Sequence, residues 1–426
     1  MSSGAASCLR PLSALVSQVD AKIAVRKDSA KPYIGLEHIP SRGAHLLGWS
    51  PASSSISTNS VFQTGDVLFG KLRPNLRKCV VAPFDGYCST DILVLRSNPG
   101  VAPSFAGKVL RTERVGAAAE MTSVGTKMPR TSWRHLSGLE IFCPGLAEQT
   151  KIAQILDTLD AAIHDTEAII AKLKAVKQGL RHDLLTRGIG ANGELRPSNA
   201  DAPHHYKQSP LGWIPTDWDV ATLESVSLTV TSGSRDWARF YADSGSLFVR
   251  IGNLTREHIN LRYDSAIYVR PPRNADGQRT RLEAGDILIS ITADLGIVGV
   301  VPEGFGDAYI NQHIALVRPS LDIINPRFVG HYLAGQGAQE FIGKLNDAGA
   351  KAGLNLPTIR GLLTAKPSRV EQDQIATRLD EIDNRVLNAA TESAKLRELK
   401  SGLMDDLLTG RVRVTALLNA ELQRGT

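Results

Sequence analysis

The chain has 426 residues, with 49 lysines and arginines, 43 aspartates and glutamates, and a formal net charge of +6. This length predicts two to four domains, and a hydrophobic fraction of 42% with 22% charged residues excludes a disordered or fibrous protein. Because no apolar run reaches about 18 residues and no signal peptide precedes the first domain, we expect a cytoplasmic protein with no membrane contact. The 4 cysteines form no C-x-x-C pair, so we expect reduced thiols and no metal site.

The excess positive charge lies at the start of the chain. Residues 1–146 hold 17 basic and 9 acidic side chains, whereas residues 201–369 hold 17 of each. A positively charged domain in a cytoplasmic protein indicates a polyanionic partner, most often nucleic acid. Solubility alone is the alternative explanation of this charge.

The sequence consists of two tandem copies of one unit. Glu148-Gln149 and the residues that follow recur, at a shift of 223, from Glu371-Gln372 onward. Upstream, Gly65-Asp66 matches Gly285-Asp286 at a slightly smaller shift. A repeat of this kind decides the architecture before single elements are assigned. Further matched residues are Arg96 with Arg318 and Pro103 with Pro326.

Each copy is predicted to have a mixed α/β head followed by a long helix, so the fold class is α+β. β-rich runs such as 91–95 and 314–317 precede a helical stretch that opens after a proline. The predicted order is head 1 (1–146), a central helix (147–187), a surface linker rich in Gly and Pro (188–218), head 2 (219–369), a distal helix (370–410) and a C-terminal tail (411–426).

The two long helices carry a seam of residues at alternating spacings of four and three, which is typical of a coiled coil. A lysine interrupts both seams at the same position, and a polar seam residue can fix register. We therefore predict that the helices pair as an antiparallel coiled coil with pseudo-twofold symmetry. Two independent amphipathic helices are the alternative. The seam residues expected to pair or to dock a partner are Ile152, Leu156, Leu159, Ile163, Leu173, Lys177 and Leu180, and Ile375, Leu379, Ile382, Val386, Leu396, Lys400 and Leu403.

Catalytic motifs are missing from the sequence. It has neither the Asn-Pro-Pro-Tyr or Asp-Pro-Pro-Tyr of amino-methyltransferases nor a Gly-x-x-x-x-Gly-Lys-Ser/Thr phosphate loop. We therefore expect a binding protein that is not itself an enzyme.

Basic residues cluster in two predicted loops. Four cations are expected to project from one turn of head 1, and head 2 uses 13 arginines and only 4 lysines between 201 and 369. Arginine can bond guanine bidentately, so this bias favours base reading. Solvated loops with surface salt bridges are the alternative. The candidate DNA-binding residues are Lys71, Arg73, Asn75, Arg77 and Lys78 in head 1, and Arg250, Asn253, Arg270, Arg273, Arg279 and Arg281 in head 2.

Several of these segments resemble the specificity (S) subunits of type I restriction-modification systems. They are the Gly-Asp-Val-Leu-Phe-Gly-Lys-Leu-Arg-Pro run at 65–74, the Cys-Ser-Thr-Asp-Ile run at 88–92 and the Pro-x-x-x-Glu-Gln start of both helices. The Leu-Leu-Thr-Gly-Arg run at 407–411 and the Leu-Gly-Trp-Ile-Pro run at 211–215 also fit. Head 1 lacks the start that head 2 shows at 211–218.

The resemblance implies that each head is a target-recognition domain for one half of a bipartite DNA sequence and that the helices act as a ruler. It also implies two methyltransferase (M) subunits, which bind S-adenosylmethionine and methylate adenine at N6. Two restriction (R) subunits, which use ATP and Mg, would complete the complex, while this chain holds no cofactor. The alternatives are a specificity subunit of a stand-alone or type II-like methyltransferase, and a coiled-coil interaction scaffold.

Overall fold

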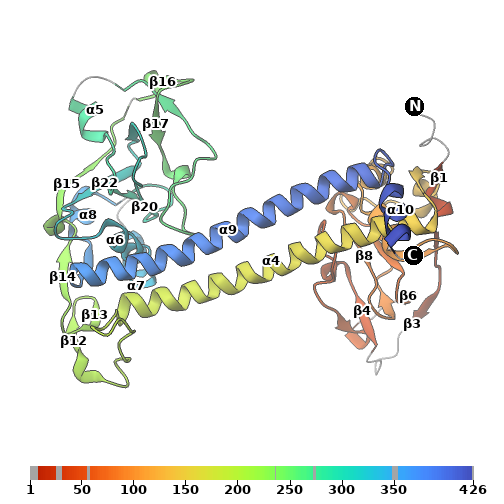
Figure 1. Cartoon of the computed structure of the whole chain (residues 1–426), viewed down its shortest axis with the longest axis horizontal. Helices are drawn as coiled ribbons and strands as arrows, with labels where there is room; N and C mark the ends of the chain where they lie inside the picture. The colour runs from red at the N-terminus through yellow and green to blue at the C-terminus, as the bar shows by residue number, and fades with distance from the viewer. Residues whose placement is uncertain are drawn as a thin grey trace. The chain divides into compact units, whose positions relative to one another are not determined.

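The computed structural model describes residues 8–24, 31–54, 58–235, 237–271, 275–347 and 354–424. The chain forms two compact units, and each contains one head and one half of each long helix. Unit 1 comprises Met1–Ala168 and Ala390–Thr426, and unit 2 comprises Ile169–Ala389. The long helices are α4 (Leu146–Thr186) and α9 (Arg369–Leu407), which Figure 1 labels.

In its described residues, head 1 contains two larger β-sheets, one two-stranded ladder and three short α-helices. One sheet has the strand order β2-β10-β7-β8 and is antiparallel throughout. The other has the order β3-β6-β9-β4-β5 and includes the parallel pair β4 and β9. A third, two-stranded ladder joins β1 to β11. The strands are β1 (Leu9–Pro11), β2 (Val16–Gln18), β3 (Lys22–Ala24), β4 (Pro32–Ile34), β5 (Ser50–Pro51), β6 (Thr58–Phe62), β7 (Val67–Gly70), β8 (Cys79–Val81), β9 (Gly86–Cys88), β10 (Ile92–Ser97) and β11 (Glu140–Phe142), and the helices are α1 (Pro103–Leu110), α2 (Glu113–Met121) and α3 (Trp133–Leu136).

Head 2 repeats this plan. The order β15-β22-β19-β20 matches the first sheet of head 1, and a second sheet has the order β16-β18-β17-β21 with β17 parallel to β21. The strands are β14 (Asp219–Thr222), β15 (Ser227–Ser232), β16 (Tyr241–Ala242), β17 (Ser246–Val249), β18 (Tyr268–Val269), β19 (Ile287–Ser290), β20 (Val298–Val300), β21 (Ala308–Ile310), β22 (Ile314–Pro319) and β23 (Leu363–Lys366), and the helices are α5 (Ala275–Thr280), α6 (Pro326–Leu333), α7 (Gln336–Asp347) and α8 (Leu356–Gly361).

The predicted strands and helices of the heads are confirmed at the matched positions. The apolar runs form the central strands β10 and β22, whose buried side chains belong to the cores of their heads. Helices α1 and α6 begin at Pro103 and Pro326, because proline fits the first helical position, where no backbone N–H is needed. The repeat in the sequence is therefore a repeat of tertiary structure.

The matched Gly-Asp residues support the first sheet of each head. Asp66 is buried and accepts two hydrogen bonds from Arg96, both at 2.8 Å. Asp286 and Arg318 form the same two contacts, also at 2.8 Å. A bidentate arginine–carboxylate pair adds geometric specificity as well as energy. The Gly-Asp segment, which carries part of the family resemblance, therefore stabilises the first sheet of each head by pairing its aspartate with an arginine of the central strand.

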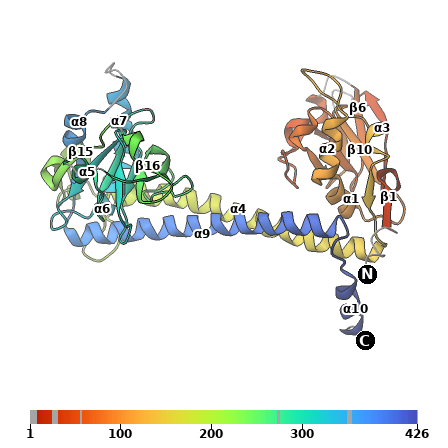
Figure 2. The same ribbon diagram turned by 90° about the horizontal axis from the view of Figure 1, so that it is seen from above.

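The seam prediction agrees with the burial of the long helices. Ile152 and Leu156 of α4 lie in the core of unit 1 together with Leu407 of α9, while Ile375 of α9 lies in the core of unit 2 together with Leu184 of α4. In each unit the beginning of one helix therefore packs against the end of the other, so the helices are antiparallel. Figures 1 and 2 both show α4 and α9 side by side within each unit.

The segment between α4 and head 2 differs from the surface linker that the sequence predicted. It forms the hairpin of β12 (Tyr206–Ser209) and β13 (Gly212–Pro215). Ile189, Ile214 and Trp218 are buried in the core of unit 2. The apolar residues among the glycines and prolines explain this packing. Burying each of their side chains contributes free energy that a solvated linker would not gain.

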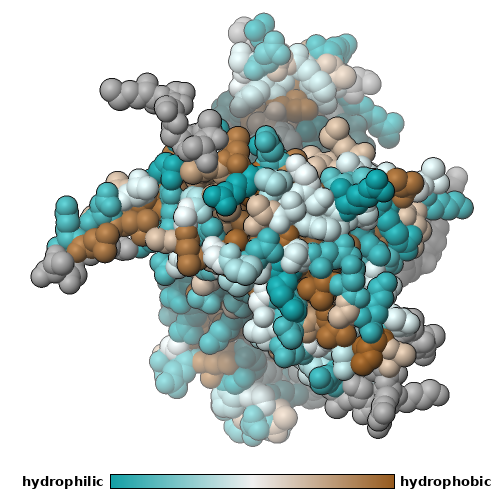
Figure 3. Space-filling view, turned by 90° about the vertical axis from the view of Figure 1, so that its right-hand side faces the viewer, coloured by the Kyte–Doolittle hydropathy of each residue, from teal (hydrophilic) through white to brown (hydrophobic). Residues whose placement is uncertain are grey.

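The C-terminal tail forms helix α10 (Thr415–Arg424), and most of its described side chains are exposed to solvent. Leu417 and Leu422 are exposed, while Leu418 packs against the core of unit 1. Figure 3 shows apolar groups in small patches among hydrophilic ones on this face of the molecule. Within the described residues, none of the helices combines the length and apolarity that crossing a bilayer requires.

Candidate nucleic-acid interface and the helix joints

The basic turn of head 1 connects β7 to β8 and contains the 3₁₀ helix η5 (Pro74–Leu76). Arg73 and Arg77, on either side of it, have left-handed backbones, with φ of 50° and 52°. Arg73 and Asn75 are exposed, and the Nη2 of Arg73 lies 3.9 Å from the Sδ of Met128. Lys71 is half-buried. The turn therefore presents Arg73 and Asn75 to solvent.

The other two cations of this turn point into the protein, contrary to the expectation that all four project from it. The Nη2 of Arg77 lies 2.7 Å from Glu113 and 3.1 Å from Glu120 on α2, and its side chain is only 9% exposed. Lys78 donates to the backbone carbonyls of Leu36 and Ile39 at 2.7 and 2.8 Å. These contacts give both residues a role in shaping the turn, and their DNA contact remains a prediction.

The candidate residues of head 2 also divide into exposed and engaged groups. Asn253 is buried and closes a turn by accepting from the backbone N–H of Arg250 at 2.9 Å. Arg279 donates to Thr231 at 2.6 Å, and Arg281 pairs with Asp307 at 3.0 Å. Arg270 is exposed, and Arg273 lies outside the described residues.

The cation clusters of the two heads lie at different places in the common fold. The turn of head 2 that corresponds to 71–78 joins β19 to β20, and Ala293 there has the left-handed backbone that Arg73 has in head 1. Residues 270, 271 and 275–281 lie instead between β18 and β19. The described basic residues of the two clusters therefore lie on different loops of the common fold.

Each long helix has a Glu-Gln pair in its first turn, and the glutamine of the pair joins the helix to its own head. The Oε1 of Gln149 accepts from the backbone N–H of Ala102 at 3.0 Å, and that of Gln372 accepts from Asn325 at 2.7 Å. The Nε2 of each donates to the carbonyl of the proline before the helix, at 2.8 and 2.9 Å. These donors and acceptors hold the first turn of α1 or α6 against the long helix.

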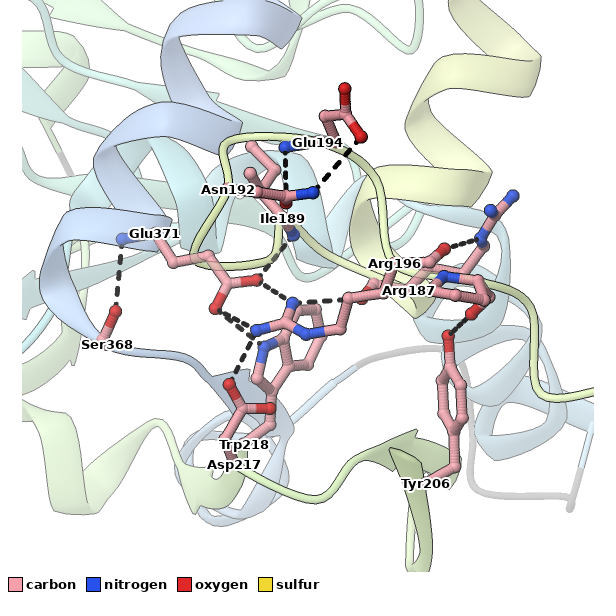
Figure 4. Close-up of polar contacts among 11 residues, drawn as sticks. Arg187, Ile189, Asn192, Glu194, Arg196, Tyr206, Asp217, Trp218, Ser368 and Glu371 are labelled. Carbon is pink, nitrogen blue, oxygen red and sulfur yellow. Dashed lines mark hydrogen bonds and ion pairs between the residues drawn. The ribbon is translucent and has the colours of Figure 1, made fainter. Parts of the chain in front are cut away.

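The glutamate of the pair holds the segment that follows the other long helix. At the start of α9, Glu371 accepts from the backbone N–H of Ile189 at 2.7 Å, from the Nη2 of Arg196 at 3.1 Å and from the indole Nε1 of Trp218 at 3.1 Å. Figure 4 shows these donors converging on one carboxylate. Arg196 also reaches Asp217 at 2.6 Å. We call this cluster the Glu371 clamp.

Glu148, at the start of α4, forms the equivalent Glu148 clamp in unit 1. It accepts from Arg413 at 2.8 and 2.6 Å and from the backbone N–H of Val414 at 3.2 Å. The hydrogen bonds from Arg413 hold the pKa of Glu148 below its usual value, although burial opposes them. In both units the end of one helix is thus fastened to the beginning of the other.

Each head is further fastened to its helix by ion pairs around aspartates. In unit 1, buried Lys108 of α1 pairs with Asp160 and, at 2.7 Å, with Asp157 of α4. Burial would raise the pKa of Asp160, but the hydrogen bonds from Lys108 and Lys400 outweigh it, so the pKa is lowered. Asp160 is therefore a carboxylate at neutral pH.

The same joint in unit 2 uses a histidine. His331 of α6 takes the place of Lys108, and its Nε2 lies 2.7 Å from Asp380 of α9. The Nη2 of Arg327 donates to the same carboxylate oxygen at 2.7 Å. Burial lowers the pKa of His331 despite the hydrogen bond to Asp380. A neutral imidazole therefore donates to the carboxylate.

These joints were missed as sites by reasoning from the sequence. Their signal was present, because Glu148 and Glu371 belong to the most closely repeated part of the chain. The repeat identifies those positions, but it cannot show that Arg196 and Arg413, which stand at different distances from their helices, would meet them.

Unit 1 also contains a cleft of about 900 Å³ between head 1 and the long helices. Its lining includes Arg42, Arg111 and Arg114 from the head and Asp160 and Arg397 from the helices. In unit 2 the loop after β17 contacts α4 instead, through Glu257, whose carboxylate lies 3.8 Å from Lys174. Among the described residues, no group of three or more His, Cys, Asp or Glu side chains could hold a metal ion.

Comparisons with known proteins agree with this geometry. The family model of the type I restriction modification DNA specificity domain matches residues 57–175 and 266–400. The chain is 23% identical over 297 residues to the type I restriction enzyme MjaVIII specificity subunit of Methanocaldococcus jannaschii, covering 69% of this chain and 67% of that protein. It is 25% identical over 361 residues to the putative MjaX specificity subunit of the same organism, covering 82% and 79%.

A solved structure gives the same result for the fold. The crystal structure of the type I restriction-modification system S subunit from M. genitalium superposes with a TM-score of 0.62 at 15% sequence identity, covering 94% of this chain and 95% of that one. The family match spans more than half of the chain and includes parts of both heads and both long helices. This chain belongs to the family of type I restriction-modification specificity subunits.

Proposed function

We propose that this chain is the non-catalytic DNA-recognition subunit of a type I restriction-modification complex and that it reads a bipartite target, one half with each head. The observation that carries the proposal is the repeated architecture. Two heads with the same first sheet, each joined to its own long helix, offer two separate reading surfaces on one frame. Different cation loops on the two heads are what two unlike half-sites would require.

The chemistry would belong to partner subunits. Two methyltransferase subunits would dock on the long helices, bind S-adenosylmethionine and methylate adenine at N6, and two restriction subunits would use ATP and Mg to cleave DNA. Exposed apolar side chains on the long helices support docking: Ile169 and Val176 lie two turns apart on α4, and Leu399 lies on α9. Contiguous apolar patches mark surfaces that partners cover, and these side chains are the candidates for such a patch.

DNA affinity would come in part from the charge of head 1. Its excess of basic residues favours contacts to phosphate, which position a protein without selecting a sequence. Exposed arginines such as Arg73 and Arg270 are the residues best placed to add base contacts.

The test is methylome sequencing of cells with and without the gene for this chain. We expect one bipartite N6-methyladenine motif to disappear on deletion and to return when the gene is restored. An electrophoretic mobility shift with the methyltransferase subunit present should weaken steeply as salt rises. An unchanged methylome, together with binding that is absent or insensitive to salt, would contradict the proposal.

A further inference from the structure

The two lysines that interrupt the helix seams form reciprocal ion pairs. Lys177 of α4 pairs with Asp383 of α9 inside unit 2, and Lys400 of α9 pairs with Asp160 of α4 inside unit 1. The side chains of Asp383 and Asp160 are only 2% and 8% exposed. Each pair therefore places a charge in a seam that is otherwise mostly apolar.

These four residues are two copies of one motif. Asp160 stands 17 residues before Lys177 on α4, and Asp383 stands 17 residues before Lys400 on α9. Because the helices are antiparallel, the lysine of each copy meets the aspartate of the other. The residue numbers of the two pairs add to the same total, so both units have the same helix register.

Besides the two clamps at the helix ends, the ion pairs oppose any other register, whereas much of the apolar seam does not. A slip of one heptad would bring Lys177 opposite Ala376 in one direction or Ala390 in the other. Asp383 would then face an aliphatic seam residue. Leucine and isoleucine can exchange partners across a seam at little cost, but a buried carboxylate without a partner is strongly unfavourable.

The pair in unit 1 also connects the register to the head. Asp160 receives Lys108 from α1 and Lys400 from α9, and Arg111 lies 3.6 Å from the same carboxylate. Burial lowers the pKa of Lys400, Arg111 adds to this effect, and Asp160 opposes it. A change of register would therefore remove Lys400 from Asp160, the carboxylate that also binds Lys108 of head 1.

We propose that the pairs Lys177–Asp383 and Lys400–Asp160 fix the register of the helix pair and thereby set the number of unspecified base pairs between the two half-sites. This inference rests on the proposed function. A slip of one heptad moves one helix along the other by about 10 Å. That distance corresponds to roughly three base pairs of duplex DNA, so a slipped complex would select a different spacer. The four residues are positioning residues and need not touch DNA.

The main test replaces charges by leucine in the full chain, as Lys177→Leu, Asp383→Leu and Lys400→Leu together. Asp160 is retained because Lys108 still binds it. The triple variant is expected to fold at least as stably as the wild type, because apolar residues can replace a buried ion pair without loss. Methylation at sites with altered spacers should rise about tenfold or more, while the half-sites stay the same.

Two further variants separate register from general stability. The charge swap Lys177→Asp with Asp383→Lys should restore spacer fidelity that either single change lowers. Thr166→Leu is the matched control, because Thr166 is a buried seam residue whose hydroxyl donates within its own helix, to Ala162 at 2.7 Å. This control should leave spacer fidelity at the wild-type level.

Helix register is also measured without DNA, by disulfide cross-linking between cysteines introduced on α4 and α9. The triple variant should form cross-links of more than one register, and the wild type of one. Wild-type cross-links and a single spacer in the triple variant would overturn the proposal. If the wild type directs no bipartite methylation but the cross-links change as expected, the register role stands and the proposed function fails.

Discussion

Units 1 and 2 use one scaffold but differ in the residues that face solvent and in those that join head to helix. Both have the bidentate Asp–Arg pair, the glutamine contact at the helix start, a glutamate clamp and a seam ion pair. They differ at the turn that joins β7 to β8 in head 1 and β19 to β20 in head 2. They also differ at the ion pairs that join each head to its helix, where Lys108 is replaced by His331. The repeated contacts stabilise the common scaffold, so the loops that differ can vary without disturbing it.

The largest expected difference is between the amounts by which the two clamps stabilise their units. Glu371→Ala should destabilise unit 2 by about 3 kcal/mol, because it leaves the buried Trp218 indole and the Ile189 backbone N–H without their acceptor and removes one of the two carboxylates that bind Arg196. Glu148→Ala should cost unit 1 about half as much, since Arg413 is one-third exposed and can be solvated. Hydrogen–deuterium exchange, read separately for peptides of each unit, measures both. Equal losses in the two units would show that the clamps are equivalent.

The second prediction separates two arginines of one turn. Arg77→Ala should destabilise head 1 by about 2 kcal/mol, because it removes a side chain that is only 9% exposed and that packs against Gly116 of α2. Arg73→Ala should leave thermal unfolding unchanged and weaken DNA binding. Calorimetry and mobility shift on both variants check this division. If Arg73→Ala destabilised the protein as much as Arg77→Ala, the division would be wrong.

The third prediction compares the heads as readers of DNA. Arg73→Ala should relax recognition of one half-site only, and Arg270→Ala should relax recognition of the other, by about 1 to 2 kcal/mol per lost base contact. Methylome sequencing of each variant reports the half-sites separately. If either change weakens both half-sites equally, that arginine contacts the DNA backbone and not the bases.

The smallest effect is a pH dependence confined to unit 2. The pKa of His331 is lowered in the folded protein from 6.5, mainly by burial, with Asp380 and Asp383 opposing and Arg327 adding to the shift. As pH falls through 6.5, the unfolded chain binds a proton that the folded chain does not. The stability of unit 2 should therefore fall as pH drops below 6.5, by at most about 1.4 kcal/mol per pH unit.

The substitution His331→Gln should flatten this slope, because glutamine does not titrate. Unit 1, which has Lys108 at this position, should show no such dependence near pH 6 and serves as the internal control. Urea unfolding between pH 5 and 7, followed by exchange in peptides of each unit, gives the slopes. Parallel slopes in the two units would rule out His331 as their source.

Much of the fold followed from the repeat and from hydrophobic spacing. The spacing of Ile152, Leu156 and their equivalents defined both long helices, because a 4-3 seam is a local property of the sequence. The candidate interface was less predictable. Arg73 and Arg77 stand four residues apart in one turn, yet one faces solvent and the other two glutamates of α2. That difference depends on an element 36 residues further along the chain.

The sequence by itself determined the two-copy plan, the mixed α/β heads, the long helices and the family to which the chain belongs, because these depend on local pattern and repetition. Only the tertiary structure decided which lysine meets which aspartate, which of the candidate arginines are exposed, and that residues of the segment 188–218 pack in a core. Those outcomes depend on contacts between residues far apart in the chain, which local spacing does not encode.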